Sequence, residues 1–331
     1  MDIGIERKQV AILKILADSK EPLGARIISR RLEDEGFHLT ERAVRFHLQV
    51  MDEKNLTQAV GRHNRAGREI TAKGLEELAN ALVSDKVGMV SSKMDDLSYR
   101  TNLDLDTRCG KIILNVSMIK KEDFSEAINI AKEAFDSGIS VGQLVVTADE
   151  GMRLGNLIVP KGMKALGTIC AVTINGILLH HRIPIKSRFG GILQIENGQP
   201  LRFTEIIEYN SSSLDPAEIF IKSKMTSVLN AVRSGSGKVL AGFREIPIAC
   251  LKETEYIIKR LEEIGISGTI TIGKPNQPTL QIPVANGYAG LVVLAGLNPV
   301  AAIEETGIET KNISMCVLVD FQELTPLSLN L

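Results

Sequence analysis

The stretch that decides the N-terminal fold reads TERAVRFHLQVM at residues 40–51, followed by LTQAV at 56–60 and GRHNRAGR at 61–68. Thr40 is a good helix N-cap, because its hydroxyl can accept the first unpaired backbone N–H groups. At about 100° per residue, apolar side chains fall on one side of this helix and polar side chains on the other. The apolar set is Val44, Leu48 and Met51, and the polar set is Arg42, Arg45 and Gln49. The polar side can enter a major groove of DNA, where arginine suits guanine and glutamine suits adenine.

A glycine-bounded basic hairpin follows the helix. Gly61 and Gly67 enclose its loop, so that Arg62 and Arg65 can lie on phosphates or in a minor groove. Two earlier helices are predicted at 5–17 and 24–35, and a later one at 72–83. The outer face of the second helix carries two more candidate phosphate contacts, Arg26 and Arg30. This order predicts an N-terminal all-α winged helix-turn-helix with a β wing at residues 1–84; the alternative is an ordinary surface helix and hairpin with scattered charge.

Length and composition leave room for two or three domains. The chain has 331 residues, 44% of them hydrophobic, and a formal net charge of −1, so any DNA-binding charge must be local. Four cysteines lie far apart without a C-x-x-C pair, which argues against a zinc site and suits a reducing cytosol. No signal peptide or membrane span is visible, because the longest apolar stretch, near 290–303, is short and contains Asn298-Pro299. We therefore expect a cytoplasmic protein.

A connecting helix is predicted within a linker at residues 85–108. Val87, Val90, Met94 and Leu97 form a narrow apolar seam along it. Such a seam is typical of a dimer contact, and repressors of this kind usually bind DNA as dimers. Packing against the next domain explains the seam equally well.

Residues 109–331 predict an α/β (α+β) body built from two tandemly duplicated lobes. GKIIL at 110–114 returns as GKVLA at 237–241, and Pro160, Gly167 and Asn175 return as Pro283, Gly290 and Asn298. We predict a first lobe at 109–209, a connecting helix within 210–235 and a second lobe at 236–331. A cleft between duplicated lobes is suited to a small ligand.

The body contains no recognisable catalytic or metal-binding motif. SGSGK at 234–238 resembles a phosphate loop, but its first glycine and its final Ser or Thr are missing, so a flexible joint is favoured. His180 and His181 are adjacent and would diverge on either a strand or a helix. We therefore expect no catalytic residue, no metal and no cofactor.

One segment of the first lobe combines groups that suit a carboxylate. A guanidinium fork, hydroxyl groups and accessible backbone N–H groups are expected from Thr173, Asn175, Ser187, Arg188, Gly190 and Gly191. The matching second-lobe positions, 310–314, lack the arginine and both glycines, which predicts that one lobe alone kept the ligand chemistry. The alternative is a turn with a surface arginine.

Motifs in both parts of the chain resemble those of a known family. They are AVRFHL at 43–48 in the head, and VTING at 172–176 and SRFGG at 187–191 in the body. Together they resemble the archaeal nitrogen-assimilation repressor family NrpR. The resemblance implies a repressor of a palindromic double-stranded DNA operator, with 2-oxoglutarate as the allosteric effector that releases it. It favours Arg188 as the effector ligand, because a dicarboxylate needs cationic and N–H donors.

The resemblance leaves the assembly and the rival functions open. It allows a homodimer, a higher oligomer or a pairing with a second repressor polypeptide. One rival is an enzyme acting on a small oxoacid with a regulatory DNA-binding head. The other is a regulator whose body binds only a protein partner.

Overall fold

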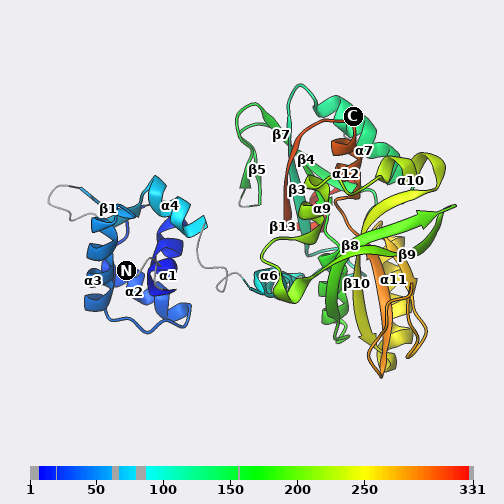
Figure 1. Cartoon of the computed structure of the whole chain (residues 1–331), viewed down its shortest axis with the longest axis horizontal. Helices are drawn as coiled ribbons and strands as arrows, with labels where there is room; N and C mark the ends of the chain where they lie inside the picture. The colour runs from blue at the N-terminus through cyan, green and yellow to red at the C-terminus, as the bar shows by residue number, and fades with distance from the viewer. Residues whose placement is uncertain (1–6, 20, 62–66, 80–86, 156, 328–331) are drawn as a thin grey trace. The chain divides into compact units, whose positions relative to one another are not determined.

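The computed structural model describes residues 7–19, 21–61, 67–79, 87–155 and 157–327 (Figure 1). The chain divides into two compact units, Met1–Val87 and Gly88–Leu331. No helix in the described ranges is long and apolar enough to cross a membrane.

The first unit is a small helical domain with a two-stranded wing. Its elements are α1 (Arg7–Ala17), α2 (Ala25–Asp34), α3 (Glu41–Glu53), β1 (Thr57–Val60), β2 (Gly67–Ile70) and α4 (Ala72–Ala79). The Thr40 hydroxyl accepts a hydrogen bond from Ala43 N at 3.3 Å, which confirms the predicted N-cap of α3. β1 and β2 pair antiparallel, as expected of a wing.

The core of this unit lies between α1, α2 and α3. Val44, Leu48 and Met51 are buried in it, and they pack with apolar residues of α1 and α2 such as Ile12 and Ile28. The prediction for α4 was partly wrong. The helical spacing of Leu75, Leu78 and Leu82 in the sequence predicts that all three point inward, but Leu75 is 49% exposed. The residues predicted to extend this helix beyond Ala79 lie outside the described ranges.

The second unit is an α/β body with two five-stranded antiparallel sheets. The strand order is β13-β3-β7-β4-β14 in one sheet and β11-β12-β10-β8-β9 in the other. The strands are β3 (Lys111–Lys120), β4 (Leu144–Ala148), β7 (Met163–Ile169), β8 (Lys186–Glu196), β9 (Gln199–Glu208), β10 (Gly237–Pro247), β11 (Thr269–Ile272), β12 (Tyr288–Leu294), β13 (Thr310–Asp320) and β14 (Thr325–Pro326), beside a small hairpin of β5 (Arg153–Leu154) and β6 (Leu157–Ile158).

Helices cover both sheets of the body. They are α6 (Met89–Arg100), α7 (Phe124–Asp136), α8 (Val172–His180), α9 (Pro216–Lys222), α10 (Val228–Ser234), α11 (Leu251–Glu263) and α12 (Asn298–Glu305), with 3-10 turns at Tyr209–Ser211, Ile248–Cys250 and Phe321–Glu323. The single connecting helix expected within 210–235 is in fact two short helices, α9 and α10. Lys224, between them, has a φ of +54°, which is incompatible with a continuous helix.

The two sequence repeats exchange their last strands. β3 opens the first repeat but pairs with β13 from the second, and β10 opens the second repeat but pairs with β8 from the first (Figure 1). The expectation of two separate lobes is therefore corrected: residues from 109–209 and from 236–331 contribute strands to both sheets.

The apolar cores follow the same exchange. One cluster joins α7 of the first repeat to α12 of the second, and the other joins α8 of the first to α11 of the second. The repeats also touch at two equivalent loops. A Cβ on Gly142 would lie 2.0 Å from Gly265 O, and one on Gly268 would lie 2.6 Å from Ser140 O. Only glycine allows so close a backbone approach on each side.

The strand pairing places the two repeats in a register different from the predicted one. Leu114 of β3 faces Ile169 of β7, and Ala241 of β10 faces Leu294 of β12 in the same way. Because GKIIL and GKVLA align Leu114 with Ala241, Ile169 is equivalent to Leu294.

Asn298 is thus the equivalent of Thr173 rather than of Asn175. The Thr173 hydroxyl bonds both the backbone N–H and the C=O of Ile113, each at 3.1 Å. The Asn298 carboxamide bonds the N–H and C=O of Leu240 at 2.8 and 2.9 Å. Two different side chains therefore tie a helix start to the same point of each sheet.

The predicted seam packs within the body. Val90, Met94 and Leu97 of α6 are buried against residues that include Ile113 and Tyr209. The dimer interpretation of these three residues is therefore wrong, because a buried side chain has no surface to offer a second chain. Only Val87, at 57% exposure, remains accessible.

Candidate functional site

The polar face of α3 lies open to solvent. Arg42, Arg45 and Gln49 are exposed on it, and Arg45 forms an ion pair with Glu41 one turn earlier. Arg26 and Arg30 are exposed on α2. The two predicted wing arginines, Arg62 and Arg65, lie outside the described residues.

A shallow groove runs beside this face. It is lined by the start of α2, the middle of α3 and the start of β2, with Arg45, Gln49 and Arg68 on its walls. Asp52, which sequence reasoning missed, holds this arrangement together. Its carboxylate accepts hydrogen bonds from Thr57 Oγ1 at 2.6 Å and from Arg68 Nε at 2.8 Å, so the end of α3 is fixed to both wing strands.

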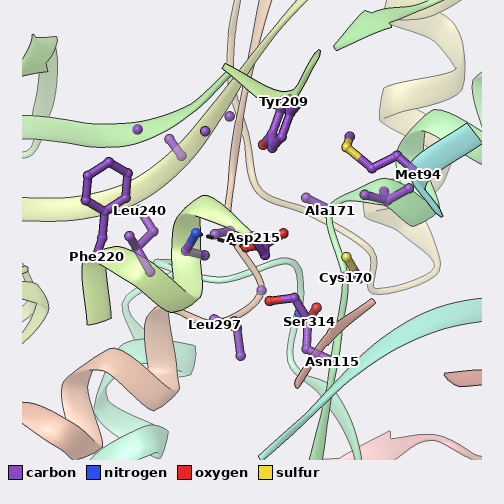
Figure 2. Close-up of a pocket in the computed structure, with 18 of the residues that line it drawn as sticks. Met94, Asn115, Cys170, Ala171, Tyr209, Asp215, Phe220, Leu240, Leu297 and Ser314 are labelled. Atoms are coloured by element: carbon purple, nitrogen blue, oxygen red, sulfur yellow. Dashed lines mark hydrogen bonds between the residues drawn. The ribbon is translucent and has the colours of Figure 1, made fainter. Parts of the chain in front are cut away.

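The body contains a cavity of about 50 Å³ where the two repeats meet. The starts of α8 and α12, which are equivalent in the repeats, both contribute to its wall through Ala171, Val172, Gly296 and Leu297. Figure 2 shows the polar ends of Tyr209 and Asp215 in this region, with the apolar side chains of Phe220 and Leu240 to one side. Partial positive charge at the two helix starts favours an anion.

Arg244 supplies a full positive charge to the cavity. Its side chain is 1% exposed, and its Nε donates to Asn175 Oδ1 at 2.6 Å while Nη1 donates to Gly242 O at 3.3 Å. No carboxylate in the described part of the chain forms an ion pair with it. Burial lowers its pKa, whereas the neighbouring Tyr209 and Cys170 raise it. A buried guanidinium that lacks an anionic partner is costly, so the chemistry of this wall favours an anionic ligand.

Gly242 keeps the cationic end of the cavity open. A Cβ at this position would lie 2.9 Å from Arg244 Nη1 and 3.1 Å from Tyr209 Oη. The guanidinium and the phenol therefore converge on one glycine, and a side chain there would displace them. Burial also raises the pKa of the Tyr209 hydroxyl, which keeps it protonated and able to donate a hydrogen bond.

Asp215 is the acidic group of the cavity wall. Its carboxylate accepts a hydrogen bond from Ala217 N at 2.9 Å and caps α9. Burial, aided by the nearby Glu218, raises its pKa to about 6, because desolvation disfavours the charged form. Burial likewise raises the pKa of the Cys170 thiol in the same wall to about 12, so this cysteine is a neutral group. No cluster of three or more metal-ligating side chains occurs among the described residues.

The predicted effector residues are distributed around this cavity in different ways. Gly190 and Gly191 line it. Asn175 holds the Arg244 guanidinium and also donates from Nδ2 to Ser187 Oγ at 2.9 Å. Ser187 and Arg188 line a neighbouring surface groove instead.

The guanidinium of Arg188 is already bonded within the protein. Its Nη1 donates to Glu245 Oε1 at 3.0 Å and to Pro283 O at 2.7 Å. The Glu245 side chain is only 6% exposed, so Arg188 neutralises a buried carboxylate. A ligand at Arg188 would have to compete with that ion pair.

Arg244 was missed because the sequence search looked for arginine beside hydroxyl groups and paired glycines. The signal was nevertheless present. GKVLAGFREI at 237–246 is a largely apolar strand that contains the adjacent charged residues Arg244 and Glu245. A charged side chain in a strand that is otherwise buried is rare unless it is paired, and it marks a candidate site.

Comparisons with known proteins agree with this division of the chain. A family model described as NrpR regulatory domains NRD1 and 2 matches residues 87–326, and a model described as the ribonuclease R winged-helix domain matches residues 10–78. A solved structure, described as a nitrogen repressor-like protein from Methanococcus jannaschii, superposes with a TM-score of 0.61 at 31% identity, covering 71% of this chain and 97% of that chain.

Curated relatives match over nearly the whole chain. The global nitrogen regulator NrpRI of Methanosarcina mazei is 36% identical over 324 residues, which are 98% of this chain and 99% of the relative. The global nitrogen regulator NrpR of Methanocaldococcus jannaschii is 32% identical over 326 residues, but the chain spans only 56% of that protein. With the winged helix and the regulatory body both matched in order, the chain belongs to the NrpR family.

Proposed function

We propose that this protein is a transcriptional repressor of nitrogen-assimilation genes that leaves its operator when 2-oxoglutarate binds the Arg244 cavity. The observation that carries the effector part is the buried Arg244 guanidinium without a carboxylate partner in the described chain. The names of the relatives, global nitrogen regulators, support the regulatory part. 2-Oxoglutarate has two carboxylates and a ketone, so it can satisfy a cation and accept neutral hydrogen bonds in one cavity.

The DNA-binding part rests on the first unit. Arg42, Arg45 and Gln49 are offered to base edges in a major groove, because they share the exposed face of α3. Arg26 and Arg30 on α2, together with the wing residues Arg62 and Arg65, are proposed as phosphate or minor-groove contacts. A palindromic operator would require two heads, supplied by a homodimer, a higher oligomer or a second repressor polypeptide.

Met94 offers a route from the cavity to the head. Its side chain lines the cavity, and its helix, α6, begins directly after the first unit in the chain. An effector can change operator affinity only if it prefers one arrangement of the protein over another. We expect Met94→Ala to bind 2-oxoglutarate within a few-fold of wild type but to release DNA at higher effector concentration.

The deciding experiment is an operator mobility shift with and without 2-oxoglutarate, using the full chain. A duplex is first selected from a random library, then titrated with protein at fixed salt. Addition of 2-oxoglutarate should release the duplex, while glutarate, which has the same chain length and both carboxylates but lacks the ketone, should do so less well. An unchanged shift at saturating 2-oxoglutarate would contradict the effector assignment, and unchanged 2-oxoglutarate recovered afterwards would argue against the oxoacid enzyme.

A further inference from the structure

An exposed aromatic ring lies in the middle of the cationic face of α3. Arg42 precedes Phe46 by four residues, Gln49 follows it by three, and Arg45 is its direct neighbour. At about 100° per residue, the four side chains fall within an arc of about 100° on one helix face. Phe46 is 63% exposed, and its ring makes an edge contact with the adjacent His47 at a centroid distance of 5.8 Å. It does not join the apolar core described for this unit.

The surroundings of Phe46 indicate which partner could cover it. An exposed phenyl ring leaves a large apolar surface in water, and contact with another apolar group would remove it from water. The flanking arginines require that partner to be anionic. Packing of this face on a second copy of itself would bring Arg42 and Arg45 against their own counterparts, which like-charge repulsion opposes.

The major groove of DNA meets both requirements. Phosphates supply the negative charge, and the C5-methyl group of thymine is the apolar group among the base edges displayed there. We infer that Phe46 packs on a thymine methyl group of the operator and selects thymine at that position. This inference rests on the proposed function, because it places α3 in the major groove.

Replacement of thymine by uracil tests the inference, because it removes the methyl group and leaves the hydrogen-bonding edge unchanged. The full chain is titrated by fluorescence anisotropy against a selected operator made with thymine and against the same duplex made with uracil. Wild type should bind the uracil duplex about three- to tenfold more weakly. Phe46→Ala should lose a similar factor on the thymine duplex and should show almost no further loss on the uracil duplex.

A matched control is available in the same unit. Leu75 of α4 is also an exposed apolar residue, at 49%, but it lies outside the face of α3. Leu75→Ala should keep the wild-type difference between thymine and uracil. Circular dichroism would show that Phe46→Ala is folded, as its exposure leads us to expect.

The failure of this inference is distinguishable from the failure of the proposed function. If wild type selects no operator, the DNA-binding proposal itself fails. If wild type binds its operator but Phe46→Ala keeps the full penalty for uracil, the methyl contact is overturned while the repressor proposal stands. The methyl contact would also be overturned if Phe46→Ala lost the same factor in affinity for random duplexes as for the operator. Such a result would show that the contact of Phe46 carries no sequence preference.

Discussion

The two repeats of the body share a scaffold but differ in the chemistry they bring to the cavity. Asn115 on β3 and Gly242 on β10 occupy equivalent positions, and both line the cavity. Two residues further on, Ser117 is the equivalent of Arg244. Both are buried, but only the second carries charge. The duplication therefore explains why two equivalent helix starts line the cavity. The positive charge, in contrast, comes from one position at which the repeats differ, Arg244 in place of Ser117.

The most severe test of this asymmetry is removal of the cation. Arg244→Met keeps much of the side-chain volume and removes the buried charge. Proteins often tolerate the replacement of buried charged groups by apolar side chains of similar size. We expect the affinity for 2-oxoglutarate to fall by about 100-fold or more, because a charged hydrogen bond in a dry site is worth roughly 3 kcal/mol. Isothermal titration calorimetry measures the loss, and operator affinity without effector serves as the control. Near-normal effector affinity would mean that the asymmetry has no role in binding.

Asp215 gives a second test, in which pH is the variable. Its pKa is raised from 3.8 to about 6, so the folded state holds a proton that the unfolded state has lost between these values. The contribution of the protonated Asp215 carboxyl to the free energy of unfolding is therefore complete below pH 3.8 and is lost as the pH rises through about 6. Asp215→Asn should be more stable than wild type by about 3 kcal/mol at pH 8 and equal to it near pH 3.5.

Urea denaturation of the body at both pH values measures this difference. Asp136→Asn, at the exposed end of α7, is the matched control and should show no such trend. The affinity of wild type for 2-oxoglutarate should also weaken above pH 6, when Asp215 ionises, and that pH dependence should vanish in Asp215→Asn. If the difference in stability between Asp215→Asn and wild type did not change with pH, it would not arise from the titration of Asp215.

Arg188 provides a contrast to Arg244, because its guanidinium is ion-paired with a buried carboxylate. Arg188→Met leaves Glu245 buried without its cation and should cost about 1–3 kcal/mol of stability, reduced by the partial exposure of Arg188. Glu245→Gln in addition should recover most of that loss. If Arg188→Met instead abolishes 2-oxoglutarate binding at unchanged stability, the effector site includes Arg188, as the sequence first suggested.

The smallest expected effect compares the two helix-start contacts. Thr173→Val and Asn298→Leu each leave a buried backbone N–H and C=O less well satisfied, at a cost of about 1–2 kcal/mol. Equal losses by thermal or urea denaturation would confirm that the two side chains play the same role. A much larger loss of stability for one variant would show that the two contacts do not contribute equally to the stability of the body.

Local signals in the sequence were sufficient for the head and for the existence of the duplication. The Thr40 cap and the helical spacing of Val44, Leu48 and Met51 act within a few residues, so they can be recognised without a structure. Strand exchange cannot be recognised in this way. β8 carries the same apolar pattern whether it pairs with β3 or with β10, and only the three-dimensional register distinguishes the two.

The candidate site was harder to predict for a related physical reason. Arg188 and Arg244 differ in what surrounds them rather than in local sequence character. Glu245 neutralises Arg188 from a strand 57 residues away, and Asn175 orients Arg244 from a helix 69 residues away. A search by residue type and spacing therefore found two glycines that line the cavity, but it could not show that Arg188 is ion-paired with Glu245.

The exchange of strands between repeats has a consequence for folding and for descent. The last two strands of the second half, β13 and β14, pair only with β3 and β4 of the first half. Met315 N also donates to Asn115 Oδ1 across 200 residues of chain. Such long-range closure predicts slow, all-or-none folding, because loop entropy is lost before the contacts form. It also suggests an ancestor with a single repeat, which would have donated its last strand to a twin. Fusion of the two genes would have turned that swapped dimer into one polypeptide.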